Sequence, residues 1–287
     1  MGPIVTVMIL ASTYALLAAG IVIVYKASRV INFAHGEIAV VGGYLFYSIG
    51  MFAPGSLWLA IGGTMVFAIV TGVAIYLVLM RRLIGEPFYV AILVTVGIAI
   101  LFKAAIIIVW RAERVTINVA DQIVAILPGG AKFSTVDLAT IMAAVLFYIG
   151  LFAFFRFTQL GLQFRGMAEN PLLASQRRVS VNAIMALAWS IAVFAACLSG
   201  VLYGGRALLS PGSVAIGLSG LTAALVGGLD SLRGAALGAI VVALAEYSTI
   251  RLIDPVLSEA VPFILLLTVM NVRPWGLFGT REELDRV

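Results

Sequence analysis

Long apolar runs, separated by short polar stretches and by glycine and proline, make up most of this chain. A helix needs about 20 apolar residues to cross a membrane, and shorter ones are tolerated inside a bundle. The pattern predicts nine such segments, at residues 4–25, 31–50, 57–80, 88–110, 137–156, 183–206, 213–229, 234–252 and 260–279. We therefore expect an all-α polytopic membrane protein with about nine transmembrane or half-membrane helices.

Composition supports the membrane class and excludes several others. Hydrophobic residues make up 63% of the chain and charged residues 11%, which leaves too little polar surface for a water-soluble body. The net charge of +5 does not indicate nucleic-acid binding, because the Lys and Arg residues stand singly or in pairs between apolar runs. With one histidine and one cysteine, Cys197, the chain has no disulfide framework and no metal-ligand set. We interpret Cys197 as a small buried hydrophobe.

The basic residues predict an orientation. If the N-terminus is outside and nine segments alternate, twelve Lys and Arg residues are cytoplasmic and five are external. Cytoplasmic loops carry the excess of positive charge, so we expect an external N-terminus and a cytoplasmic C-terminus. The polar stretch 111–136 is then external, and the loop 157–182 is cytoplasmic. The apolar N-terminus lacks a basic n-region, so we interpret it as a first membrane helix.

Two similar glycine pairs indicate an internal repeat within a single transmembrane domain, residues 1–287. Val41-Gly42-Gly43 and Val226-Gly227-Gly228 each end a short segment of small residues that follows a long apolar span. In the predicted orientation the two short segments run in opposite directions. The pattern therefore predicts an inverted repeat, with halves at about 4–83 and 183–252. Paired short, glycine-interrupted segments of this kind point to a transport pathway near the membrane midplane.

The short segments supply most of the candidate pathway residues. Polar groups at membrane depth usually face a bundle interior or a pathway. In the first segment five candidates fall on or near one helical face by their spacing, and the acidic residue Glu37 is a sixth candidate: Asn32, His35, Ala39, Gly42, Gly43 and Glu37. In the second they form a small-residue stripe: Ser213, Gly217, Gly220 and Gly227. Two interpretations stay open, since His35 and Glu37 suit gating or anchoring, and the glycines suit a pathway or close helix packing.

Lys103 is a further candidate because of its depth. It stands seven residues before Trp110, about 10 Å of helix rise from that end of its segment, so snorkelling to the interface would be strained. Contact with solute or pairing with a carboxylate such as Glu246 would explain it. The chain shows no convergent nucleophile, acid or metal set, which argues against an intramembrane enzyme.

The loop 157–182 contains a helix start. Asn170 can serve as N-cap and Pro171 as the first helical residue. A short helix parallel to the membrane, apolar on one side and basic at its end, would suit docking onto another protein. An ordinary loop helix is equally compatible with the composition.

Several motifs in order resemble the permeases of the branched-chain amino acid family of ABC importers, specifically the H-type subunit. The likeness runs nearly end to end. It is carried by Val30–Glu37 with Gly42-Gly43-Tyr44, by Thr95–Ala99, by the glycine block Gly227–Gly238, and by Arg273–Gly279 near the C-terminus.

The resemblance implies a bacterial inner-membrane permease that pairs with a second, M-type permease. Two cytoplasmic ATPase subunits and a periplasmic substrate-binding protein complete such an importer, which carries branched-chain or other amino acids or related small polar solutes. ATP and magnesium belong to the partner subunits, since this chain has no phosphate-binding loop, and we expect no catalytic activity and no cofactor here. The coupling helix that seats in the ATPase would include Arg165, Ala168, Glu169, Asn170, Pro171 and Ala174.

The chain also departs from the family pattern. The family usually has Gln-Asn where this chain has Lys103-Ala104, and glycine at Asp230. A lysine in place of a neutral amide could alter what passes, so the solute could differ from leucine, isoleucine and valine. The alternative function is a stand-alone secondary transporter or channel for a small polar solute, which would need no ATPase partners.

Overall fold

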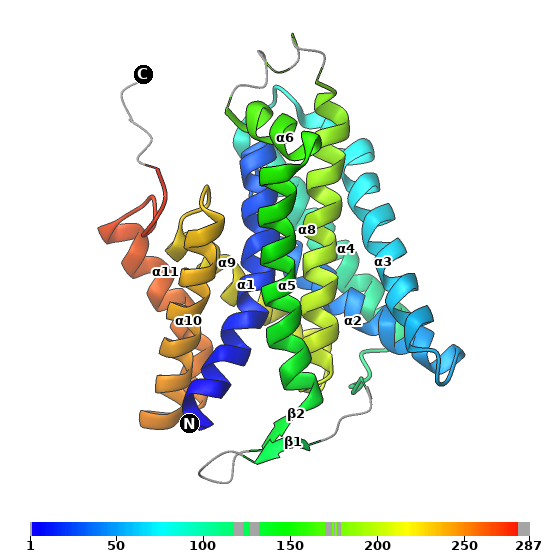
Figure 1. Ribbon diagram of the computed structural model, residues 1–287, viewed down its shortest axis with the longest axis vertical. Helices are drawn as coiled ribbons and strands as arrows, with labels where there is room; N and C mark the ends of the chain where they lie inside the picture. Colours follow the sequence, from blue (N-terminus) through cyan, green and yellow to red (C-terminus); the bar gives the residue numbers. More distant parts are fainter. Residues whose placement is uncertain are drawn as a thin grey trace.

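The computed structural model describes residues 2–117, 123–126, 132–169, 174, 176 and 179–280. Helices make up most of this part of the chain (Figure 1). The α-helices are α1 (Gly2–Ser28), α2 (His35–Phe52), α3 (Leu57–Ala74), α4 (Phe88–Trp110), α5 (Thr135–Phe157), α6 (Gln159–Glu169), α8 (Val181–Gly204), α9 (Ile216–Gly227), α10 (Leu232–Leu252) and α11 (Val261–Val272). A π-helical stretch, Ile75–Leu79, and a 3₁₀ turn, Met80–Leu83, extend α3, while 3₁₀ turns at Pro211–Ala215 and Val256–Ala260 precede α9 and α11.

Membrane-spanning helices confirm the predicted class. Among the described residues, six helical stretches are long and apolar enough to cross a membrane: Gly2–Ser28, Leu57–Leu83, Phe88–Trp110, Thr135–Phe157, Val181–Gly204 and Leu232–Leu252. The shorter helices α2, α9 and α11 fall in the remaining predicted segments. Two predicted ranges are too long, because α2 begins at His35 rather than 31 and α11 ends at Val272 rather than 279.

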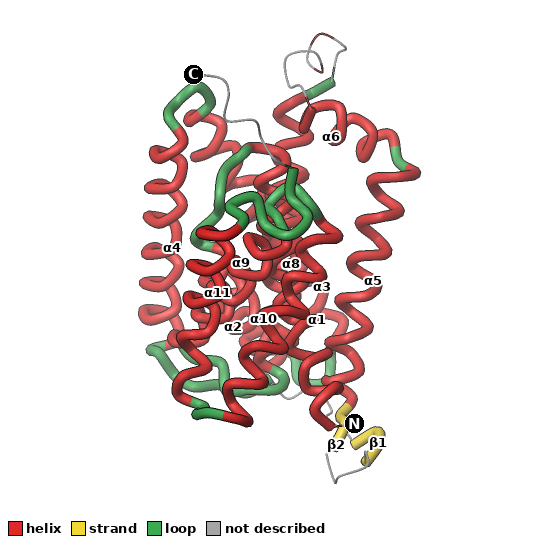
Figure 2. The backbone as a smooth tube through the Cα atoms, turned by 90° about the vertical axis from the view of Figure 1, so that its left-hand side faces the viewer, coloured by secondary structure: helices red, strands yellow, loops and turns green. Residues whose placement is uncertain are grey.

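The centre of the bundle is formed by α1 and α8. Helix α1 is apolar around most of its circumference and rich in small residues, as expected of a helix surrounded by others, and Leu16, Leu17 and Ala18 are fully buried. In Figure 2, α4 and α5 stand at opposite sides of the molecule. Both expose large apolar side chains, such as Ile108 and Ile149, which suits a lipid or protein neighbour rather than water.

The contacts between helices follow a symmetric pattern. Helix α1 packs on α9 and α10, as α8 packs on α2 and α3, and the pair α2–α3 corresponds to the pair α9–α10. Exchanging α1 with α8, α2 with α9 and α3 with α10 therefore leaves these contacts unchanged. Figure 1 shows α1 and α8 running in opposite directions along the bundle. An inverted repeat produces this arrangement.

Helix α1 begins at one end of the bundle, and α11 runs toward the other, as Figure 1 shows. The N-terminus lies at the end that carries a small antiparallel hairpin, β1 (Ile123–Ile126) with β2 (Lys132–Ser134). The sequence pattern did not predict these strands. Nearby, Val115 and Leu209 exchange backbone hydrogen bonds of 3.0 and 2.8 Å, and Arg206 forms an ion pair with Asp137 at 2.6 Å.

At the other end, the C-terminal segment caps α9. The amide of Leu277 donates to the Val226 carbonyl at 2.8 Å, and that of Phe278 donates to the Gly227 carbonyl at 3.0 Å. These carbonyls belong to the last turn of α9, which has no partners of its own within the helix. The sequence motif Arg273–Gly279 and the second glycine block are therefore one structural unit.

Candidate functional site

Helix α2 begins inside the bundle rather than at its surface. After α1 the chain turns at Arg29, which adopts a left-handed conformation with φ 56°, and residues 30–34 are not helical. The Oδ1 atom of Asn32 accepts a hydrogen bond of 3.0 Å from the Ala34 amide, which closes a turn of the kind that asparagine favours. The prediction that Asn32 lies on the helical face of His35 is therefore wrong, since Asn32 belongs to the turn before the helix.

The first turns of the two short helices touch each other. A Cβ atom placed on Gly217 of α9 would lie 2.3 Å from the Cα of Gly36 in α2. A Cβ placed on Gly36 would lie 2.5 Å from the Val214 carbonyl oxygen. Side chains would not fit at either position, so glycine permits this approach of the two backbones. We call this contact the junction of α2 and α9.

His35 is the first residue of α2 and is fully buried beside α1. A Cβ placed on Gly20 would lie 2.6 Å from the Cε1 and Nε2 atoms of the imidazole. The ring thus fills the space that Gly20 leaves open, with Ala192 of α8 also close by. The imidazole is thus held by packing between α1 and α8, and the choice between gating and anchoring for His35 stays a prediction.

The remaining small residues of the first segment pack against α8. A Cβ on Gly42 would lie 2.7 Å from the Cys197 sulfur, and one on Gly43 would lie 3.0 Å from the Gly200 carbonyl oxygen. Gly200 in turn meets the backbone of Ala39. These positions let α2 and α8 approach closely, as small residues do in membrane bundles.

The second segment shows the same kind of packing. Gly220 lies against the Leu17 side chain of α1, and Gly227 lies against the backbone of Gly234 in α10. Ser213 has a different structural role. Its Oγ atom accepts a hydrogen bond of 3.1 Å from the Ser210 amide and so caps the 3₁₀ turn before α9. In this structure, these residues make helix contacts within the chain.

Glu37 and Lys103 differ from the other candidates because they reach outward. Glu37 is half-buried in the first turn of α2, next to the junction, and Lys103 is exposed on α4. Both of these charged side chains can therefore be reached from outside this chain. The helices that carry them, α2 and α4, pack against each other.

Glu246 is not the partner of Lys103, contrary to the pairing suggested by the sequence. Its carboxylate is buried between α1, α9 and α10. Tyr14 donates a hydrogen bond of 2.5 Å to Oε2, and Ser219 donates one of 2.9 Å to Oε1. This cluster was not predicted, because nothing in the sequence pattern distinguishes Tyr14 from the other tyrosines. The one signal in the sequence was a carboxylate inside a predicted span.

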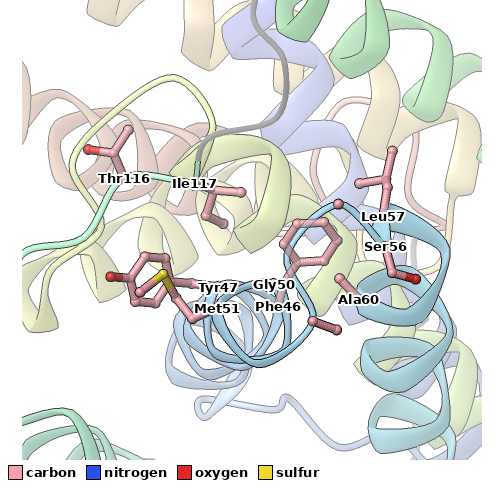
Figure 3. A pocket seen from close by; sticks show the side chains of 11 residues that line it. Phe46, Tyr47, Gly50, Met51, Ser56, Leu57, Ala60, Thr116 and Ile117 are labelled. Carbon is pink, nitrogen blue, oxygen red and sulfur yellow. The ribbon is translucent and has the colours of Figure 1, made fainter.

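Two cavities lie near the ends of α2. The first, of about 390 Å³, is lined by the end of α2, the start of α3 and residues 116–117 (Figure 3). Tyr47 and Met51 lie together on one side of it, and Phe46 and Leu57 lie on the other. The second, of about 410 Å³, lies beside the turn at Arg29 and is lined in part by Tyr76 and Trp189. No predicted pathway residue lines either cavity.

Comparison with known proteins gives one consistent result. The family model described as the permease component of the branched-chain amino acid transport system matches residues 3–270. The chain belongs to this family. It is 28% identical to the high-affinity branched-chain amino acid transport system permease protein LivH of Salmonella typhimurium, over 97% of this chain and 94% of that protein. LivH of Escherichia coli K12 gives the same values.

A third relative extends the likeness to another organism. The permease protein BraD of the high-affinity branched-chain amino acid transport system of Pseudomonas aeruginosa is 28% identical, over 96% of this chain and 94% of that protein. No solved structure matches the chain. The chain is thus a membrane permease of this family.

Within this permease, the predicted coupling residues lie at the C-terminal end of the bundle. Helix α6 lies there after α5, with Phe164 and Met167 buried on its inner side (Figure 1). Arg165 and Glu169 are exposed on it, Ala168 is half-buried, and the later residue Ala174 packs in the same apolar cluster as Phe164. Asn170 and Pro171 lie outside the described residues, so the predicted helix start stays a prediction.

Proposed function

We propose that this chain is the transmembrane permease subunit of a binding-protein-dependent ABC importer for branched-chain or other amino acids or related small polar solutes. The observation that carries the proposal is the junction, where two short helices of opposite direction meet inside a bundle of symmetric contacts. Paired interrupted helices at a repeat interface are the architecture of a transport pathway. Family membership suggests the solute class, because the names of the curated relatives describe branched-chain amino acid transport.

The chain is expected to work in an assembly. A second, M-type permease, two cytoplasmic ATPases and a periplasmic binding protein would complete it, with ATP and magnesium bound by the ATPases. Helix α6 supports this proposal, because its outer side is exposed and bears Arg165 and Glu169 at one end of the bundle. ATPase movement at this end would rock the repeat halves about the junction, in an alternating-access cycle.

The proposed orientation follows from the same assembly. The end with α6 and the C-terminus would face the cytoplasm of a bacterial cell, and the end with the N-terminus and the hairpin β1–β2 would face outward. The excess of basic residues in loops at the α6 end supports this direction.

Purification of the tagged chain from cells that express the complete importer tests the assembly. We expect two ATPase subunits and a second permease to co-purify, and the ATPase activity to rise on addition of the loaded binding protein. Charge reversal at an exposed α6 position, Arg165→Glu, should lower that stimulation, while Arg251→Glu at the other end should not. A chain that purifies without ATPase subunits and transports by itself would contradict the importer and favour a secondary transporter.

A further inference from the structure

The outward side of α2 and α4 carries two opposite charges at membrane depth. Lys103 lies within the apolar helix α4 and is exposed, and Glu37 is half-buried in the first turn of α2. Charged groups on a lipid-facing surface at this depth are costly, so such groups normally face a protein neighbour or a water-filled space. This side of the permease is therefore unsuited to direct contact with lipid.

Two hydrogen bonds fix how α2 and α4 lie beside each other. Thr95 Oγ1 donates to the Ile31 carbonyl at 3.3 Å near one end, and Trp110 Nε1 donates to Ser48 Oγ at 2.7 Å near the other. The two segments thus run side by side in the same direction. By this register, Lys103 stands about one helical turn beyond the level of Glu37.

The direction of the lysine side chain brings the two charges nearer. In an α-helix each Cα–Cβ bond tilts toward the N-terminus of the helix. The side chain of Lys103 therefore leans away from Trp110 and toward the level of Glu37. The same tilt opposes snorkelling toward the end at Trp110.

The two charges do not close an ion pair with each other. Among the described residues, Arg206 and Asp137 form such an ion pair at the end of the bundle, whereas Glu37 and Lys103 form none with each other. Glu37 and Lys103 thus remain separated, beside the junction formed by Gly36. A carboxylate and an ammonium held apart on one face match the two charges of a zwitterion.

We propose that Glu37 and Lys103 form a zwitterion-binding pair on the outward side of α2, where Glu37 binds the ammonium and Lys103 the carboxylate of a passing amino acid. The pair would be part of the pathway surface and would set the preference for solutes that carry both charges. This inference rests on the proposed transport function.

Thiol labelling tests whether this face is accessible to water and occupied by solute. In the complete importer, Cys197, which is buried, is replaced by alanine, and Ala99→Cys or Leu101→Cys is introduced, so that Glu37 and Lys103 both stay in place. Ala99 is half-buried and lies one helical turn before Lys103 on the same side of α4. Leu101 is 70% exposed and lies two residues from Ala99, about 200° around the helix, so it is a control at matched depth. A membrane-impermeant methanethiosulfonate reagent should label Ala99→Cys and leave Leu101→Cys unlabelled, and L-leucine with its binding protein and ATP should slow the labelling. Equal labelling at both positions, or labelling at Ala99→Cys that L-leucine does not change, would overturn the inference.

Uptake measurements separate recognition from structure. Lys103→Met and Glu37→Gln should each lower ATP-driven L-leucine uptake by about tenfold or more, the usual effect of losing a charge-assisted hydrogen bond. The exchange variant Glu37→Lys/Lys103→Glu should recover part of the uptake, with thermal stability unchanged in all three. Unchanged uptake in both single variants would contradict the pair. Uptake that needs no ATP would contradict the importer, and the labelling result would still decide the inference.

Discussion

At the residue scale, glycines at the junction permit a close approach of two backbones. Gly36 and Gly217 each leave no room for a Cβ atom, and the atoms in the way belong to the backbone rather than to a movable side chain. Relief of such overlap requires the helices to separate. The tolerance of these positions to alanine is thus a direct measure of the contact.

Gly36→Ala and Gly217→Ala should each destabilise the protein by about 1–3 kcal/mol, the range typical of overpacking. Gly150→Ala is the control, because a Cβ atom on this helical glycine in α5 would meet no atom within 4 Å. It should be neutral or slightly stabilising, since alanine is the better helix former. Thermal unfolding in detergent, followed by size-exclusion chromatography, measures the difference. Equal midpoints for all three variants would show that the junction is not a tight contact.

The buried cluster around Glu246 gives a second prediction at this scale. Tyr14→Phe removes one of the two donors to the carboxylate and should cost about 1–3 kcal/mol of stability. In a Glu246→Gln background the same change should cost less, because the acceptor is already altered. Tyr89→Phe, an exposed tyrosine at the start of α4, should have no effect. Additive losses in the double variant would indicate that the two residues do not interact.

Individual residues show where sequence reasoning stops. The position of Lys103 within its helix was correctly inferred from its spacing to Trp110, because α4 ends at Trp110 as the apolar run predicted. Its pairing with Glu246 was wrong, because the partners of Glu246 come from α1 and α9, and no local pattern specifies which helices meet. The turn role of Asn32 was missed for a related reason, since polar residues at even spacing look alike until the start of the helix is known.

At the scale of elements, the tail and α9 form one unit. Gly228 has φ 109°, a conformation that glycine adopts readily, and a Cβ there would lie 2.5 Å from the Gly279 nitrogen. The tail amides in turn satisfy the last carbonyls of α9. The end of this short helix therefore depends on residues about 50 positions later in the sequence.

Gly228→Ala should release the tail from α9. We expect faster amide hydrogen exchange at Leu277 and Phe278, whose amides would lose their carbonyl partners, while exchange within α5 stays unchanged. Mass spectrometry of peptides that cover the tail and α5 measures both in one sample. Exchange in the tail that matches the wild-type protein would contradict the capping role.

Apolar periodicity predicted the long helices well but not the interruptions. Residues 88–110 coincide with α4, because a long apolar run ended by charges and proline has one stable form in a membrane. The late start of α2 and the early end of α11 were missed, since the residues there are apolar enough to continue a helix. Contacts with Thr95 and with the end of α9 hold these segments in other conformations.

At the scale of the whole molecule, the described helices place α6 and the C-terminal segment at one end and the hairpin at the other (Figure 1). The loop charges assigned the first end to the cytoplasm. Cysteines at exposed positions can test this in intact cells. In a Cys197→Ala background, Val256→Cys should react with an impermeant thiol reagent added outside, while Leu160→Cys on α6 should react only after permeabilisation. The reverse pattern would invert the proposed orientation.

The two glycine pairs predicted an inverted repeat, since opposite directions of two similar segments follow from counting spans. The repeat stays a prediction, with which the symmetric helix contacts are compatible. How closely the two short helices meet was not foreseen, because close approach depends on Gly36 and Gly217 facing each other across segments far apart in sequence. The sequence also left the glycines open between a pathway and packing. The structure shows their packing contacts, and the pathway remains a proposal.

Uptake of labelled L-leucine into proteoliposomes tests the central claim most directly. The permease is reconstituted with its second permease, both ATPase subunits and the binding protein, and in parallel by itself. The proposed function predicts uptake against a gradient that requires ATP inside the assembly, and none from the chain alone. Uptake by the chain alone, at a rate that ATP does not change, would contradict it.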